Sequence, residues 1–257
     1  MPGRRSIPRK KSLQKSSPGD AIRVVPIHHP PLQRVAAVNL TYRGGPLIEA
    51  AKVFTIFWGP SWANAAAGLA AAMNKFFGDI LVSPLIDQLS EYNVSGQSIG
   101  HGNVIGSKTI AAGAPTKSVT DSAIQTAVKN WISSGIVAQS DGNTLYFIFL
   151  EAGIVSVMGG SRSCQSYCGY HNNVGGIYYA VMPYPGCGGC LGGLTVLNAL
   201  TGTSSHELCE AITDPVPGTG WYDDTHGEIG DICAWQFKKV SGYTVQLEWS
   251  NKANKCF

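Results

Sequence analysis

The chain has 257 residues, of which 44% are hydrophobic and only 14% are charged. This is enough apolar material for a sizeable core, and its many Val, Ile, Leu and aromatic residues exclude a wholly disordered chain. The low charge, together with 31 glycines and 7 cysteines, favours a secreted protein over a cytosolic one.

The net charge of +3 is unevenly distributed. Residues 1–20 contain six basic residues and one acid, whereas the rest of the chain has 13 basic and 15 acidic residues. We therefore predict a flexible, basic and proline-rich leader at 1–33 and a single domain at 34–257. The leader is typical of a solvated tail or of an arm that binds an anionic surface. The domain carries no basic stripe with interleaved aromatic residues, so we expect no nucleic-acid partner.

The apolar pattern of the domain alternates between strand-like and helix-like segments. The sequence predicts, in chain order, strands at 35–42 and 53–58, helices at 65–80 and 85–92, a strand with loops at 96–113, a helix at 121–133, strands at 143–150 and 175–182, a helix at 194–212, and a hairpin of 234–238 with 240–250. We expect the helix at 194–212 to break near Gly202. The fold class predicted is α/β (α+β): one mixed-sheet domain with a loop-rich, cysteine-containing C-terminal half.

Two features bear on location. The basic start is followed by polar residues, so no signal peptide is visible. The uncharged stretch 53–74 is about long enough to cross a bilayer. It contains Pro60, Asn64 and many small residues, which favour a buried strand followed by a helix, and we expect no membrane span.

All seven cysteines lie in the last 94 residues: Cys164, Cys168, Cys187, Cys190, Cys209, Cys233 and Cys256. The first four form two close pairs, and four cysteines so spaced can hold a structural zinc. Their glycine-rich surroundings are more typical of disulfides in secreted chains. We favour disulfides, and one cysteine stays unpaired however the others combine.

The strongest physical signal is a run of 75 residues, between Arg162 and Lys238, without a single Lys or Arg. Seven of the 16 carboxylates lie within 25 positions of this run: Glu207, Glu210, Asp214, Asp223, Asp224, Glu228 and Asp231. His171, His206 and His226 lie in the same run. Uncompensated carboxylates repel one another, and a bound cation removes that cost.

Within this run, residues 206–210 form an H-E-x-x-E pattern. On a helix His206 and Glu210 are one turn apart and share a face, so both can bind one ion. Glu207 lies one step round the helix and can reach a water on that ion. These are the mechanics of H-E-x-x-H zinc peptidases, with a carboxylate in place of the second histidine.

A third ligand must come from downstream. We prefer Asp231, with Glu228 second and His226 or Asp214 as further candidates. Alternation puts Glu228 and Asp231 on different sides of a straight strand, so both bind only if Gly230 kinks the chain. In the expected mechanism, Glu207 deprotonates a zinc-bound water, and Tyr222 or His226 stabilises the oxyanion.

Other interpretations of the same residues stay open. Ser204 and Glu207 can form a capping box, which would make Glu207 structural. The acids Asp223, Asp224 and Glu228 can form a calcium loop, although their spacing is not that of an EF-hand. Paired carboxylates such as Glu207 and Asp231 can also hydrolyse a glycan.

Several short motifs resemble the EXORDIUM-like, phosphate-induced protein family over roughly residues 36–236. They are Tyr42-Arg43-Gly44-Gly45-Pro46, Phe57-Trp58-Gly59, Ser205-His206-Glu207-Leu208-x-Glu210, Asp214-Pro215, Gly220-Trp221-Tyr222 and Glu228-Ile229-Gly230-Asp231-x-Cys233. The resemblance implies an extracellular or cell-wall-associated protein. The biochemical activity of that family is not well defined, so the resemblance implies location more firmly than reaction.

The motif helix, preceded by a strand at 177–182 and a loop, more loosely resembles the zincin metallopeptidases. With Glu210 as an anionic ligand, the zinc should be a weaker Lewis acid than in those enzymes. The function predicted is a secreted zinc-dependent hydrolase acting on a protein, a peptide or a cell-wall polymer. The alternative is a non-catalytic extracellular module in which Zn²⁺ or Ca²⁺ is structural. The sequence does not indicate an oligomeric state.

Overall fold

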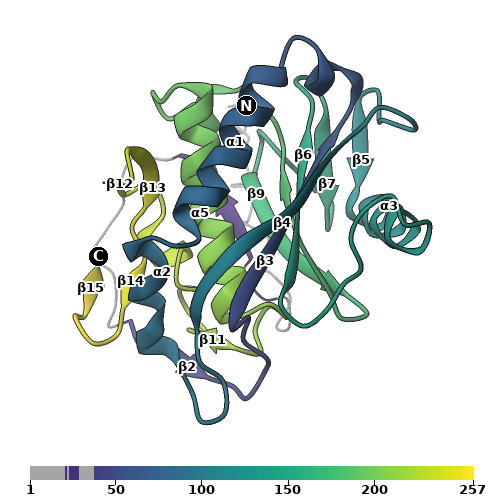
Figure 1. The fold of residues 1–257 in the computed structure, drawn as a ribbon. Coiled ribbons are helices and arrows are strands. Elements are labelled where there is room, and N and C mark those ends of the chain that lie inside the picture. Colours follow the sequence, from purple (N-terminus) through teal and green to yellow (C-terminus); the bar gives the residue numbers. More distant parts are fainter. Residues whose placement is uncertain (1–20, 22, 29–37) are drawn as a thin grey trace, which may run out of the picture.

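A six-stranded mixed sheet runs through the centre of the molecule, in the order β1-β9-β10-β6-β3-β4 (Figure 1). The computed structural model describes residue 21, residues 23–28 and residues 38–257. The sheet strands are β1 (Val24–Pro26), β3 (Ala50–Trp58), β4 (Gly100–Ile110), β6 (Thr144–Leu150), β9 (Tyr167–Val174) and β10 (Ile177–Met182). β10, β6, β3 and β4 are parallel, whereas β9 runs antiparallel to both β10 and β1.

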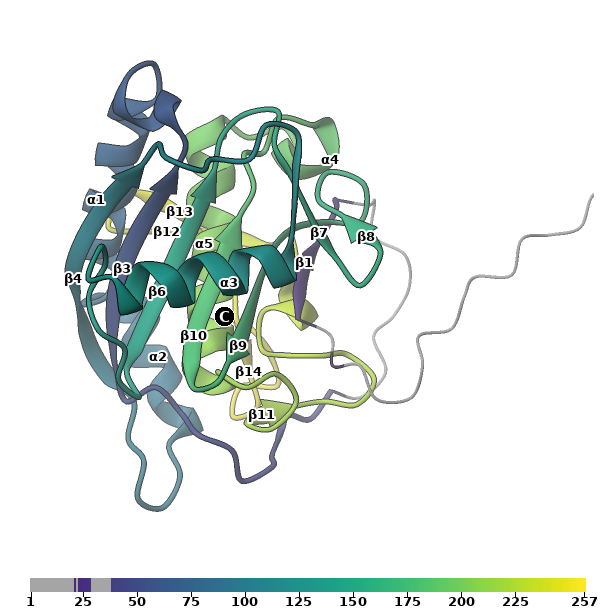
Figure 2. The ribbon, with the colours of Figure 1, turned by 90° about the vertical axis from the view of Figure 1, so that its right-hand side faces the viewer.

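Helices cover both faces of this sheet. α1 and α5 lie on one face and α3 on the other (Figures 1 and 2). The helices are α1 (Ala67–Ile80), α2 (Pro84–Gln88), α3 (Asp121–Ser133), α4 (Gly188–Leu191) and α5 (Val196–Thr213), with 3₁₀ turns η1 (Pro60–Ala63), η2 (Leu89–Tyr92) and η3 (Asp231–Cys233). Short strands complete the fold: β2 (Thr41–Tyr42), β5 (Ser118–Thr120), β7 (Val155–Met158), β8 (Ser161–Arg162), β11 (Trp221–Tyr222), β12 (Phe237–Val240), β13 (Tyr243–Gln246), β14 (Trp249–Ser250) and β15 (Lys255–Cys256).

The core has two layers because the central strands are apolar on both sides. All seven residues of β6, a continuous apolar run, are buried. Phe147 and Phe149 pack toward α1, whereas Tyr146 and Ile148 belong to the cluster that includes α3. This double burial is typical of parallel strands covered by helices on both faces. The mixed α/β fold expected from the sequence is confirmed.

The long elements follow the sequence prediction closely. The predicted strands at 53–58, 143–150 and 175–182 correspond to β3, β6 and β10, and the helix at 121–133 is α3. The helix predicted at 194–212 is α5, and it is not broken at Gly202. A Cβ on that glycine would lie 2.8 Å from the Phe237 ring. The glycine therefore permits close packing against the hairpin of β12 and β13.

Two strands next to the motif helix were not predicted. β9 lies in the cysteine-rich segment that the sequence assigned to loops. β1 lies within the predicted leader, and Val25 pairs with Gly169 of β9. The rest of the leader, 1–20 with residue 22 and 29–33, lies outside the described residues, as do residues 35–37 of the first predicted strand.

Six of the seven cysteines form disulfides, as the glycine-rich surroundings indicate. The pairs are Cys164–Cys187, Cys168–Cys190 and Cys233–Cys256. Cys209 is the unpaired cysteine, and it is buried in α5. Three disulfides are typical of proteins that fold in an oxidising compartment.

We expect the double variant C233A/C256A to lose about 3 kcal/mol of unfolding free energy, because the bond closes a loop with a sequence separation of 23. Urea denaturation followed by tryptophan fluorescence measures the change. The control is C209A, which removes a buried thiol without opening a loop and should cost about 1 kcal/mol. Equal losses in the two variants would contradict the expected role of this disulfide.

The length and apolar composition of a helix decide whether it could span a bilayer. Among the described residues, no single helix is both long and apolar enough to span a bilayer. Within the same described ranges, one bent pair, Ala67–Ile80 with Pro84–Tyr92, meets the length and composition criteria together. Large apolar side chains of this pair, such as Phe76, Phe77 and Leu85, are buried in the core.

Candidate metal centre

α5 carries the H-E-x-x-E pattern through the most buried part of the molecule. Thr195 caps the helix by accepting a hydrogen bond from the backbone N–H of Asn198. The helix is packed between the sheet and β13, and 15 of its 18 residues are buried. Small residues allow this approach: a Cβ on Gly169 of β9 would lie 2.6 Å from the Thr203 methyl group.

Two histidines and four carboxylates meet at the C-terminal half of α5: His171, His206, Glu207, Glu210, Glu228 and Asp231. The first five are at most 1% exposed, and the side chain of Asp231 is 5% exposed. The ion pairs that the structure gives these carboxylates are all with His171 and His206. Buried carboxylates are costly unless they are paired or bind a cation.

The first ligand set is the one predicted from the sequence. His206 Nε2 lies 2.8 Å from Glu210 Oε1 and 3.8 Å from Asp231 Oδ1, and these three atoms lie within 4.8 Å of one another. His206 Nε2 makes no hydrogen bond of acceptable geometry, although it is fully buried. Its Nδ1 lies 2.7 Å from the side-chain nitrogen of Gln246 in β13.

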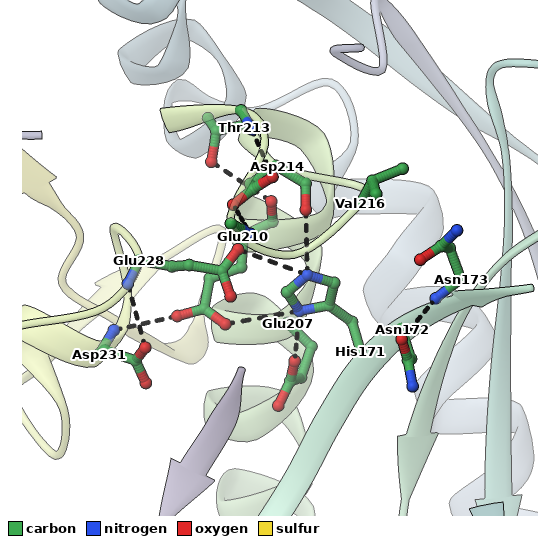
Figure 3. Close-up of polar contacts among 12 residues, drawn as sticks. His171, Asn172, Asn173, Glu207, Glu210, Thr213, Asp214, Val216, Glu228 and Asp231 are labelled. Atoms are coloured by element: carbon green, nitrogen blue, oxygen red, sulfur yellow. Dashed lines mark hydrogen bonds and ion pairs between the residues drawn. The ribbon is translucent and has the colours of Figure 1, made fainter. Parts of the chain in front are cut away.

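The second ligand set was not predicted, and it is centred on His171 of β9 (Figure 3). His171 Nδ1 lies 3.1 Å from Glu207 Oε2 and 3.5 Å from Glu210 Oε2. The three atoms again lie within 4.8 Å of one another. On the other side of the ring, His171 Nε2 lies 3.2 Å from the Asp214 carbonyl oxygen and 3.4 Å from Glu228 Oε1.

Glycines and a capped loop hold this arrangement together. A Cβ on Gly230 would lie 2.8 Å from His206 Nδ1 and 3.0 Å from Glu210 Oε1, so this position has no room for a side chain. Asp214 is the C-cap residue of α5. Its carboxylate accepts hydrogen bonds from three backbone N–H groups: Gly218 at 2.6 Å, Thr219 at 3.0 Å and Gly220 at 2.6 Å. These bonds fix the residue whose carbonyl faces His171.

The pKa values of the cluster show that it needs positive charge. Burial lowers the pKa of His171, but Glu207 and Glu210 raise it more, to about 10. Burial likewise raises the pKa of Glu210, but the two histidines lower it to about 2. Burial and neighbouring carboxylates raise the pKa of Glu228 and Asp231 well above the usual range. In the absence of a metal, protons must therefore supply the compensating charge.

The predicted metal ligands lie close together. Two of the predicted catalytic residues, Tyr222 and His226, contact other residues instead. His206, Glu210 and Asp231 form one ligand set, and Glu228 lies beside His171. His226 Nδ1 lies 2.8 Å from Asp223 Oδ1. Tyr222 is buried in β11, with the Arg43 guanidinium 4.6 Å from its ring centre. Neither residue belongs to a ligand set.

His171 is the residue that sequence reasoning failed to single out. Its signal was present, because Gly169 and His171 alternate on the face of β9 that packs on α5. The cysteines on either side suggested a loop, and the alternation was not recognised. Comparisons with protein-family models, curated proteins and solved structures found no match for this chain.

Proposed function

We propose that this protein is a secreted zinc-dependent hydrolase, with peptides as the leading substrate class. The observation that carries the proposal is the convergence of His206 Nε2, Glu210 Oε1 and Asp231 Oδ1 in a buried position. The nitrogen makes no hydrogen bond of acceptable geometry there, although Glu210 Oε1 lies 2.8 Å away. Three protein ligands are the usual number at a catalytic zinc.

In this proposal His206, Glu210 and Asp231 would hold the zinc, which would supply Lewis-acid chemistry at the site. Glu207 is the general base. One of its oxygens, Oε2, faces His171, whereas Oε1 has no hydrogen-bond partner and can accept a proton. Burial raises the pKa of Glu207, and a raised pKa suits a base that must take up a proton near neutral pH.

The donor atoms favour zinc over calcium. Both ligand sets include an imidazole nitrogen, which suits zinc and other late transition metals. Calcium takes six to eight oxygen ligands. The extracellular location rests on the three disulfides and on the sequence resemblance to extracellular proteins.

One observation favours a second candidate, a non-catalytic module with a structural metal. Each ligand of the centre is at most 5% exposed, and structural zinc sites are closed whereas catalytic ones keep an open position. A hydrolase with this centre must admit its substrate by a movement of the covering segments. A glycan hydrolase that uses Glu207 and Asp231 needs no metal and would keep its activity after chelation.

We expect E207Q to lower kcat by about 10²- to 10⁴-fold while the zinc at His206, Glu210 and Asp231 stays bound, because the variant keeps the shape of Glu207 but loses the base. A library of unstructured peptides, with cleavage read by mass spectrometry, measures turnover. Elemental analysis of the same samples measures zinc.

The matched control is E248Q. Glu248 is another fully buried carboxyl near the centre, and burial raises its pKa well above the usual range. Because its protonated form resembles glutamine, this variant should keep wild-type turnover. Zinc-replete wild-type protein that cleaves no peptide would contradict the peptidase and leave the structural module. Turnover that persists in E207Q would contradict the role of Glu207 as base.

A further inference from the structure

We propose that the centre binds two divalent cations, bridged by the Glu210 carboxylate. The first lies in the set of His206, Glu210 and Asp231. The second lies in the set of His171, Glu207 and Glu210. Glu210 contributes a different oxygen to each set, Oε1 toward His206 and Oε2 toward His171. This inference concerns metal content, and it holds whether or not the protein is a hydrolase.

The hydrogen bonds of His171 point to the second ion. Its Nε2 lies 3.2 Å from the Asp214 carbonyl oxygen, which can only accept, so Nε2 carries a proton. In the neutral ring Nδ1 then has a lone pair, yet two carboxylate oxygens face it. Only a second proton or a metal ion makes this contact favourable. A ring N–H held by a carbonyl, with the other nitrogen free, is the usual arrangement of a metal-binding histidine.

The distances around His171 fit an ion as well as they fit hydrogen bonds. Ligand atoms about 2.0–2.1 Å from a tetrahedral ion lie about 3.3 Å from one another. The distances from His171 Nδ1 to Glu207 and Glu210 are 3.1 and 3.5 Å. Glu210 Oε2 has no hydrogen-bond partner, although it is fully buried.

The charge of the cluster matches two divalent ions. Glu207, Glu210, Glu228 and Asp231 carry four negative charges when ionised, and the histidines are neutral when they bind metal. One divalent ion leaves two of these negative charges to be compensated by protons or by a second ion. Both oxygens of Glu228 are buried without a hydrogen bond. Glu228 is thus placed to stabilise a cation at His171 through the ring, because its Oε1 faces Nε2.

A shared carboxylate is a common feature of two-metal sites, in which the ions lie about 3.5–4 Å apart. The second ion is compatible with the proposed role of Glu207. It takes Oε2 as a ligand and leaves Oε1, which has no hydrogen-bond partner, able to accept a proton.

The test is the metal content of the full-length protein after loading with Zn²⁺ and dialysis into metal-free buffer, measured by elemental mass spectrometry. We expect two zinc ions per chain in the wild type, one in H171A and one in H206A. A wild-type value of one would overturn the proposal without any variant. Two ions retained in H171A would also overturn it, because the second ion would then lie elsewhere.

The matched control is H226A, which removes a histidine paired with Asp223 outside the two ligand sets and should keep two zinc ions. A second measurement uses Mn²⁺ in the wild-type protein. Electron paramagnetic resonance should show a spin-coupled manganese pair, as expected for ions joined by one carboxylate. The six-line spectrum of isolated ions at full occupancy would contradict a shared Glu210. If the protein binds two zinc ions but cleaves no peptide, the proposed function is contradicted and this inference still holds.

Discussion

Removal of the bound ions with a chelator is expected to lower the melting temperature by about 10 °C for each ion. An ion that binds only the folded state, at a free concentration a thousand times its Kd, adds about 4 kcal/mol of stability. A chain of this size shifts by about 2–4 °C per kcal/mol. Differential scanning calorimetry, with and without chelator, measures the difference. An unchanged melting temperature would show that the buried carboxylates are not held by metal.

The chelated protein should also lose stability as the pH rises. Glu228 and Asp231 have raised pKa values in the folded state, so they hold protons that the unfolded chain releases above about pH 4.5. His171, with a folded pKa of about 10, acts in the same direction above about pH 6.5. Glu210, with a pKa of about 2, acts in the opposite direction, but below pH 4.5. We expect the unfolding free energy of the metal-free protein to fall between pH 5 and pH 9, and urea denaturation at these pH values measures the slope.

The variant D214A is expected to lose about 3–5 kcal/mol of unfolding free energy. It leaves three backbone N–H groups without their acceptor, that of Gly220 in a buried position and those of Gly218 and Thr219 in partly buried ones. The loop also fixes the Asp214 carbonyl that faces His171 Nε2. Affinity for the second ion should therefore fall by about 10- to 100-fold, and zinc competition with a fluorescent chelator measures it.

The control for this variant is D223A. Asp223 likewise accepts backbone N–H bonds, from Thr225 and His226, but it lies in a more exposed turn outside the ligand sets. D223A should leave zinc affinity at the wild-type value. Equal zinc affinities in D214A and D223A would contradict the positioning role of Asp214.

The motif helix and the first ligand set could be predicted from the sequence for a simple physical reason. His206 and Glu210 are four residues apart on one helix, so their spacing alone puts them on one face. The choice of Asp231 as third ligand was a weaker prediction, because a straight strand would point Glu228 and Asp231 to opposite sides. The chain instead turns into η3 after Gly230, and both side chains approach the histidines.

The second ligand set could not be derived from spacing in the same way. His171 and Glu207 are 36 residues apart, and they meet only because β9 reverses direction beside β10 and packs under α5. The disulfides Cys164–Cys187 and Cys168–Cys190 join β9 and its approach to the α4 region. Their glycine-rich surroundings gave the sequence its loop-like character, whereas in the fold the disulfides tie the strand next to the sheet edge to the α4 region.

The burial of the centre has a consequence for the lifetime of any ion that it would bind. Val25, which pairs with Gly169, is 3% exposed and packs in the cluster with Cys168 and Cys190, and the Trp235 indole N–H donates to the Pro26 carbonyl. An ion in this buried centre would leave only when the surrounding elements open, so the rate of local unfolding would set its release. Zinc would then enter the folded protein slowly, and the compartment in which the chain folds would decide which metal the protein carries first.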